Sequence, residues 1–154
     1  MNYDRKPAND SGYLLWQISN LWQRVINEIL SNHNITHVQY LLLATIVWMK
    51  KNKMVITQNS LAMQAQSHKM MTSKVLRSLE KNGYITRITN QDDSRYKYIE
   101  LTEMGHEKYL DVKKIFKKED AKFFEKIERN RFSLNRIFID MIEENSKYVN
   151  ARSA

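Results

Sequence analysis

Residues 68–83 have the sequence HKMMTSKVLRSLEKNG, which predicts a helix from His68 to Asn82 because Gly after Asn is a common helix end. At 100° per residue, its side chains divide onto two sides. The first side is mainly apolar and consists of His68, Met71, Thr72, Val75, Leu76 and Leu79. The second side is polar or cationic and consists of Lys69, Met70, Ser73, Lys74, Arg77 and Lys81, with Glu80 as the one acid of the helix. We therefore expect the apolar side to pack against the chain and the cationic side to face solvent.

The cationic side carries the residue types that contact base edges in DNA. An α-helix fits the major groove, where Lys and Arg contact guanine and Ser can contact any base. Met70, an unusual side chain for a solvated position, can touch the methyl group of thymine. The five residues expected in the major groove are Lys69, Met70, Ser73, Lys74 and Arg77. Since a solvated amphipathic helix has the same pattern, the neighbouring segments must decide between the two interpretations.

These neighbouring segments complete the pattern of a winged helix-turn-helix. Upstream, Thr57 is expected to cap a short helix over residues 58–66, and Ser67 to cap the longer helix. Downstream, residues 84–88 and 96–101 are rich in β-branched and aromatic side chains, as in a two-stranded hairpin. The order of helix, turn, helix and hairpin favours DNA binding over a merely solvated helix.

The expected hairpin has a strongly polar connection, and its cations suggest a second DNA contact. Arg95 and Lys97 lie at or beside the tip, where an Arg can enter a narrow minor groove. Asp93 stands two residues before Arg95, so its carboxylate can hold the guanidinium in place. A polar turn with a chance Asp-Ser-Arg sequence is the alternative.

Two helices are expected before this unit. Apolar residues at spacings of three and four predict the first, which Asp10 or Ser11 caps and residues 32–34 end. The second opens at Thr36, with Gln39 completing a capping box, and runs to Lys50 or Lys51. Because this second helix is apolar on most of its circumference, we expect it at the centre of the fold.

The remaining segments are a short one before the helix pair and a long helical one after the hairpin. Residues 53–56 are compatible with a small strand. From Thr102 onward the apolar period is helical again, with a polar break at residues 128–131. The fold class expected is therefore mostly α (α+β), a winged helix-turn-helix flanked by N- and C-terminal helices.

The charge of the chain is concentrated in its middle third. The 154 residues carry a formal net charge of +8, and residues 50–100 hold ten Lys or Arg against four Asp or Glu. Such a concentration indicates a polyanion as partner, and nucleic acid before anionic lipid, because lipid binding usually shows as one basic amphipathic helix. A basic surface that only aids solubility is the alternative.

Several kinds of chemistry are missing from the sequence. With no Cys there is no thiolate nucleophile, disulfide or Cys-type zinc site, and three Gly leave no phosphate loop or dinucleotide fingerprint. His33 and His37 are four residues apart, but the expected helix boundary separates them, so we expect no metal site. Nothing resembles a nucleophile with its base or a pair of catalytic carboxylates, and we expect neither an enzyme nor a cofactor.

The location expected from the sequence is the cytoplasm. The longest apolar run, residues 40–49, is about half of a membrane span. Residues 1–10 are polar and do not form a signal peptide. We expect a soluble protein with no membrane partner.

Three motifs together resemble the MarR family of winged-helix regulators, named for multiple antibiotic resistance. They are KVLRSLEKNGYI at residues 74–85, DSR at 93–95 and LTEMG at 101–105. Each is weak alone, but the family has them in this order and spacing. Tyr84 departs from the family, in which Leu is usual. The resemblance extends over roughly residues 13–147 and is strongest from 57 to 106.

The resemblance implies a homodimer on double-stranded DNA with a near-palindromic operator. It implies dimerisation helices at residues 1–34 and 102–154, around a DNA-binding domain at 35–101. It also implies Lys69, Met70, Ser73, Lys74 and Arg77 in the major groove, and Arg95 with its orienting Asp93 in the minor groove, Lys97 lying beside them. Half-sites are expected about one helical turn, roughly 34 Å, apart.

The resemblance also implies a small phenolic or lipophilic effector, since many relatives respond to one. The candidate lining residues are the aromatic ones of the first two helices, namely Trp16, Trp22, His37, Tyr40 and Trp48. Aromatic side chains are more often plain core, which is the alternative here. The expected function is that of a ligand-responsive repressor. A winged helix for protein interaction and a ligand-independent DNA-binding regulator are the alternatives.

Overall fold

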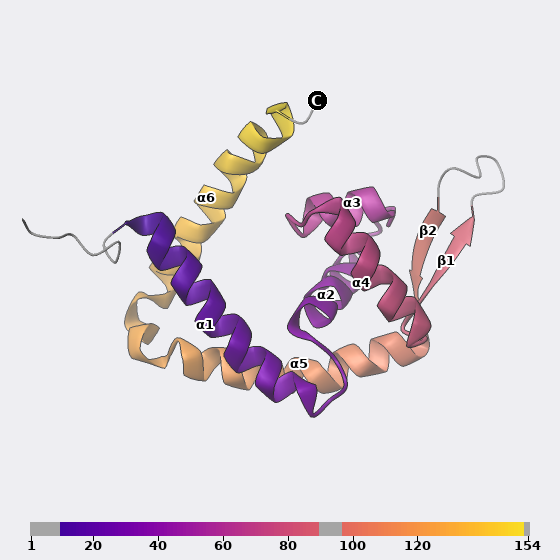
Figure 1. Cartoon of the computed structure of the whole chain (residues 1–154), viewed down its shortest axis with the longest axis horizontal. Coiled ribbons are helices and arrows are strands. Elements are labelled where there is room, and N and C mark those ends of the chain that lie inside the picture. The colour runs from indigo at the N-terminus through magenta and orange to yellow at the C-terminus, as the bar shows by residue number, and fades with distance from the viewer. Residues whose placement is uncertain (1–9, 90–96, 153–154) are drawn as a thin grey trace, which may run out of the picture.

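The computed structural model describes residues 10–89 and 97–152 (Figure 1), and the predicted order of elements is confirmed except for the small strand suggested at residues 53–56. Its elements are α1 (Ser11–Ser31), α2 (His37–Lys51), α3 (Gln58–Gln64), α4 (Lys69–Lys81), β1 (Ile85–Thr89), β2 (Lys97–Leu101), α5 (Glu103–Phe123), the 3-10 helix η2 (Glu125–Asn130) and α6 (Arg131–Arg152). The long helix α5 runs along the base of the molecule, with α1 and α6 at one end and α2, α3, α4 and the hairpin at the other (Figure 1).

The core lies around α2, as its apolar circumference predicted. Leu43 and Ile46 of α2 are fully buried. They belong to one cluster with Leu76 of α4, Ile85 of β1 and Val112 of α5. Burial of this apolar area is the main force that holds the helix pair and the sheet together.

Two capping boxes fix the starts of α2 and α3. The Gln39 amide donates to Thr36 Oγ1 over 3.2 Å, and the Thr36 amide donates to Gln39 Oε1 over 2.8 Å, which confirms the box predicted there. Thr57 caps α3, as predicted, in a reciprocal arrangement with Ser60. Both caps use amide groups that a helix leaves free in its first turn.

Ser67, in contrast, does not cap α4. The N-cap position belongs to His68, whose side chain makes no capping hydrogen bond. The Ser67 hydroxyl lies 2.5 Å from Thr72 Oγ1, and Thr72 Oγ1 also donates to the His68 carbonyl. The Ser67 hydroxyl is therefore bonded to the buried hydroxyl of Thr72 and not to a free backbone amide in the first turn of α4.

The strand suggested for residues 53–56 does not form. Lys53 has a left-handed backbone with φ of 55°, which turns the chain, and the segment reaches β2 only at its end. There the Ile99 amide donates to the Ile56 carbonyl over 2.8 Å, and Thr57 forms a single bridge with Tyr98. The described sheet therefore has two antiparallel strands, β1 and β2, with Arg87 opposite Ile99.

The LTEMG motif builds the joint between the hairpin and α5. Thr102 caps α5 by accepting from the Gly105 amide over 3.0 Å, and its hydroxyl donates to the Gly83 carbonyl over 2.6 Å. Gly83 has φ of 75°, a conformation that favours glycine. A Cβ on Gly105 would overlap the carbonyl oxygen of Tyr84. These contacts explain why the motif has Thr and Gly three residues apart.

A second joint fastens α1 and α6 to the far end of α5. Asp120 of α5 accepts from Trp22 Nε1 over 3.0 Å and from Arg131 Nη2 over 2.7 Å. The helical stretch breaks earlier than the predicted 128–131, since α5 ends at Phe123 and η2 follows. In the described parts of the chain, no helix is long and apolar enough to cross a bilayer.

Candidate nucleic-acid interface

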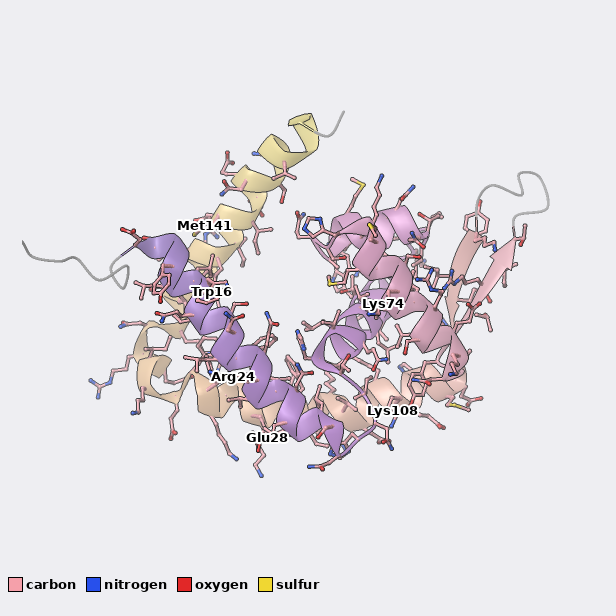
Figure 2. The ribbon with its side chains drawn as sticks, viewed as in Figure 1. Trp16, Arg24, Glu28, Lys74, Lys108 and Met141 are labelled. Carbon is pink, nitrogen blue, oxygen red and sulfur yellow. The ribbon has the colours of Figure 1, made fainter. Side chains whose placement is uncertain are left out.

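The side of α4 that was predicted to be cationic faces solvent. Lys69, Lys74 and Arg77 are exposed, Met70 is 86% exposed, and Ser73 is half-buried. Arg77 Nη1 donates to Ser73 Oγ over 3.2 Å, which holds the guanidinium along the helix. Within residues 10–89 and 97–152, no carboxylate forms an ion pair with these three cations. Figure 2 shows Lys74 on α4, far from Trp16 of α1 and Met141 of α6.

The opposite side of α4 packs into the core, with one correction. Thr72, Leu76 and Leu79 are buried, as predicted. His68 and Met71 are exposed instead of packed. The buried residues of α4 begin at Thr72, so the first turn of this helix extends beyond the core.

A shallow depression brings four of the five predicted major-groove residues together. It is lined by Lys69, Met70, Ser73 and Arg77 of α4 and by Gln58 of α3. Lys74 lies outside this lining. Sequence analysis missed Gln58, because only the packing of α3 against α4 brings it there.

The predicted wing residues are placed only in part. Lys97 begins β2 and is exposed. Asp93 and Arg95 lie outside the described residues. The exposed cation of Lys97 stands on the hairpin, and the hairpin lies beside α4 (Figure 1).

Arg87 of β1 is a cation that sequence analysis did not single out. It lies opposite the buried Ile99 and two residues from the buried Ile85, so it shares the inner face of the sheet. Its Nε is 3.2 Å from Glu80 Oε2, without hydrogen-bond geometry. The alternation of side chains along the predicted strand was the signal that would have found it.

Three of the five candidate effector residues meet at the junction of α1, α2 and α5. The Trp22 ring contacts His37 edge-on, with centroids 5.9 Å apart, and Tyr40 lies 4.5 Å from Phe116. Phe116 also contacts Trp22 at 5.9 Å, a partner that sequence analysis missed. The three residues therefore belong to one packed aromatic cluster: Trp22, His37, Tyr40 and Phe116.

Burial changes the titration of two members of this cluster. Desolvation lowers the pKa of His37 below its usual 6.5, since burial disfavours the imidazolium. Burial, and then the neighbouring Tyr109, raise the pKa of Tyr40 to about 12. Both side chains are therefore neutral near pH 7, which suits an apolar or aromatic environment.

The other two candidates, Trp16 and Trp48, do not join the cluster. Trp16 is 59% exposed and contacts Tyr13 at 5.7 Å, nearer the start of α1. Trp48 is 47% exposed near the end of α2. The prediction grouped five aromatic residues by type, whereas the helix faces separate them.

An apolar groove lies between α1 and α6. Its lining includes Leu15 of α1 and Phe138, Met141 and Ile142 of α6. Among the described residues, neither η2 nor α6 has a buried side chain. α6 leaves large apolar side chains such as Ile137 and Ile142 about half exposed, and clustered exposed apolar side chains often mark interaction surfaces.

Comparison with known proteins places these features in a family. Residues 24–112 match the family model described as Transcriptional regulator SarA/Rot. The chain is similar to an uncharacterized HTH-type transcriptional regulator, YdcH of Bacillus subtilis (strain 168), with 40% identity over 118 residues that cover 77% of this chain and 80% of the relative.

Solved structures share the fold. The S. aureus MepR–DNA complex matches with a TM-score of 0.75 and 24% identity, covering 88% of this chain and 98% of that one. CouR from Rhodococcus jostii RHA1, bound to p-coumaroyl-CoA, matches with a TM-score of 0.73 and 20% identity, covering 90% and 94%. At these identities the likeness shows a common fold.

Proposed function

The chain belongs to the SarA/Rot family of transcriptional regulators and has the winged-helix fold of MarR, and from this premise we propose that it binds double-stranded DNA in a sequence-specific manner. The observation that carries the proposal is the two-sided helix α4: Thr72, Leu76 and Leu79 are buried on one side, and the cations of the other side are exposed with no ion-pair partner among the described residues. Family and fold are those of regulators, which are not enzymes.

Each predicted contact has a place in this proposal. Lys69, Met70, Ser73, Lys74 and Arg77 contact base edges and flanking phosphates in the major groove. Arg95 enters the adjacent minor groove, with Asp93 as its orienter and Lys97 beside it. MepR, which shares the fold, is in complex with DNA in its crystal structure.

The proposal includes a homodimer on a near-palindromic operator. Residues 1–34 and 102–154 form the dimerisation part around a DNA-binding domain at 35–101. The support is the apolar groove between α1 and α6, which a second copy of these helices would cover. Two recognition helices then meet half-sites about one helical turn, roughly 34 Å, apart.

The proposal also includes a small phenolic or lipophilic effector that releases the protein from DNA. Its place is the aromatic cluster of Trp22, His37, Tyr40 and Phe116, because the cluster joins α1 and α5 to α2. CouR, with the same fold, is bound to p-coumaroyl-CoA. A ligand at this junction that favours another spacing of the two α4 helices would end repression by shifting the population. The relative YdcH is a protein of Bacillus subtilis, and because bacterial DNA lies in the cytoplasm we propose the same location for this chain.

The experiment that tests DNA binding reverses two charges on α4. Duplexes retained from a random pool first define the operator. Lys74→Glu with Arg77→Glu is expected to weaken its binding by at least about 30-fold, since two lost contacts at about 1–3 kcal/mol each cost at least about 2 kcal/mol. Lys117→Glu with Lys118→Glu is the matched control, because both lysines are exposed on α5.

The oligomeric state of each variant is measured in parallel. Loss of retention in the α4 variant, with the oligomer intact and the control within a few-fold of the unaltered chain, supports the proposal. Equal retention by the α4 variant and the control would defeat it and favour a winged helix for protein interaction. Effector binding is tested separately, by release of the operator with a panel of small phenolic acids.

A further inference from the structure

A second cationic pocket lies between α3 and the sheet. It has a volume of about 270 Å³, and its polar lining consists of Thr57, Gln58, Asn59, Arg87 and Lys97. Gln58 also lines the depression in front of α4. The pocket therefore adjoins the proposed major-groove contacts at Gln58.

Arg87 is the unusual member of this lining. Its side chain is only 18% exposed, and Nε and Nη2 are shielded from solvent and have no hydrogen-bond partner among the described residues. The Glu80 carboxylate lies 3.2 Å from Nε but is itself 42% exposed. The part of the Arg87 side chain that remains accessible lines the pocket, so the pocket is suited to an anionic ligand that supplies acceptor oxygens.

The chemistry of the pocket selects the class of ligand. The planar fork of a guanidinium matches the oxygens of a phosphate, and Lys97 adds a second positive charge at the rim. With Glu80 counted, the local charge of these three groups remains positive. A phosphate monoanion of the DNA backbone meets both requirements, and DNA on α4 brings such phosphates to this side of the molecule.

We propose that this pocket receives one backbone phosphate of the DNA duplex in each subunit, bound by Arg87 and Lys97. The inference rests on the proposed function. Such a contact carries no sequence information but fixes the depth and register of α4 in the groove. Glu80 acts as a positioning residue, because its carboxylate lies 3.2 Å from Nε and holds the guanidinium beside the pocket.

The test is the salt dependence of DNA affinity. Each phosphate contact contributes about 0.9 to the slope of log K against log salt, and the dimer makes two such contacts. Loss of the contact in Lys97→Gln or in Arg87→Gln should therefore lower the slope by up to about 1.8. Both variants should lose affinity equally for the operator and for an unrelated duplex. Lys118→Gln, an exposed site on α5, is the matched control and should keep the slope.

Arg87 is largely buried, so folding is measured beside binding. Thermal unfolding shows whether Arg87→Gln folds, and Arg87→Lys retains the charge without the fork. The exposed Lys97 carries the test by itself if Arg87→Gln does not fold.

Neutral methylphosphonate groups, placed one at a time along the operator, locate the contact. The unaltered chain should lose affinity at one position in each half-site, and Lys97→Gln should lose less at that same position. Inorganic phosphate at constant ionic strength should leave the affinity unchanged.

Three results overturn or separate the two proposals. Unchanged slopes for the pocket variants, while the α4 variant still loses DNA, overturn the phosphate pocket and leave the proposed function intact. A flat methylphosphonate scan, with inorganic phosphate competing only in the unaltered chain, assigns the pocket to a free phosphate and overturns the inference. If every variant still binds DNA, including Lys74→Glu with Arg77→Glu, the proposed function itself is wrong.

Discussion

The regions at the two ends of α5 differ in how far they bury their apolar side chains. At one end, α2, α4 and the hairpin bury theirs, and Leu43, Ile46 and Leu76 are fully covered. At the other end, described side chains of α6 such as Ile137 and Ile142 stay more than half exposed. The winged helix therefore buries its apolar side chains within one chain, whereas described apolar side chains of α6 remain in solvent, and this difference supports the dimer proposed above.

The largest effect is expected from a cavity in the buried core around α2. Leu43→Ala should lower the free energy of unfolding by about 2–5 kcal/mol, since it removes buried methyl groups and leaves a cavity. Urea unfolding followed by circular dichroism measures the loss. Leu41→Ala, at an exposed site on the same helix, should cost less than about 1 kcal/mol. Equal losses would mean that α2 is not the centre of the fold.

The second prediction concerns the exposed apolar groove between α1 and α6. Ile142→Asp places a charge in the apolar groove between α1 and α6 and should weaken self-association by about 100-fold, or about 2.7 kcal/mol. Sedimentation across a range of concentrations measures the shift. Ser133→Asp, which puts the same charge at an exposed site of α6, should leave association unchanged. Unaltered association of Ile142→Asp would place the dimer interface elsewhere.

The third way acts on the joint between the hairpin and α5. Gly105→Ala should cost about 1–3 kcal/mol, because the new methyl group overlaps the Tyr84 carbonyl and the backbone must shift. Gly12→Ala is the matched control: a methyl group there meets nothing within 4 Å, and Ala favours the helix. Thermal unfolding compares the two, and a stable Gly105→Ala would refute the tight joint.

The smallest effect expected is a pH dependence from the aromatic cluster. Burial lowers the pKa of His37 in the folded chain, so the unfolded chain binds more protons as the pH falls below about 6.5. Stability is then complete above this pH and declines below it. His37→Gln should flatten that part of the curve, and His106→Gln, at an exposed site, should not. Urea midpoints between pH 5 and 8 measure both.

Local signals predicted more of the fold than long-range ones did. The Thr36–Gln39 box depends on neighbours three residues apart, and the burial of Leu76 follows from helical period alone; both predictions are confirmed. Ser67 was misassigned because its partner Thr72 offers a buried hydroxyl that competes with the helix end. The strand predicted at residues 53–56 does not form, because the chain here meets β2 only through the single bridge of Thr57 with Tyr98 and not through a series of backbone hydrogen bonds.

The candidate site was predictable wherever it lies on one helix. The exposed face of α4 followed from its spacing, but Gln58 and Arg87 join it only through the packing of α3 and the sheet. The aromatic cluster shows the same limit. Residue type selected Trp16 and Trp48 together with Trp22, and only the fold shows that Trp22 alone of the three meets His37.

The placement of Trp22 gives the molecule an optical reporter of its own. Its indole donates to Asp120, touches rings from α2 and α5, and shares Asp120 with Arg131, so any shift among these helices alters its surroundings. Trp16 and Trp48 are about half exposed, and iodide should quench their emission first. The unquenched fluorescence then follows, without any label, the junction between the end helices and the winged helix.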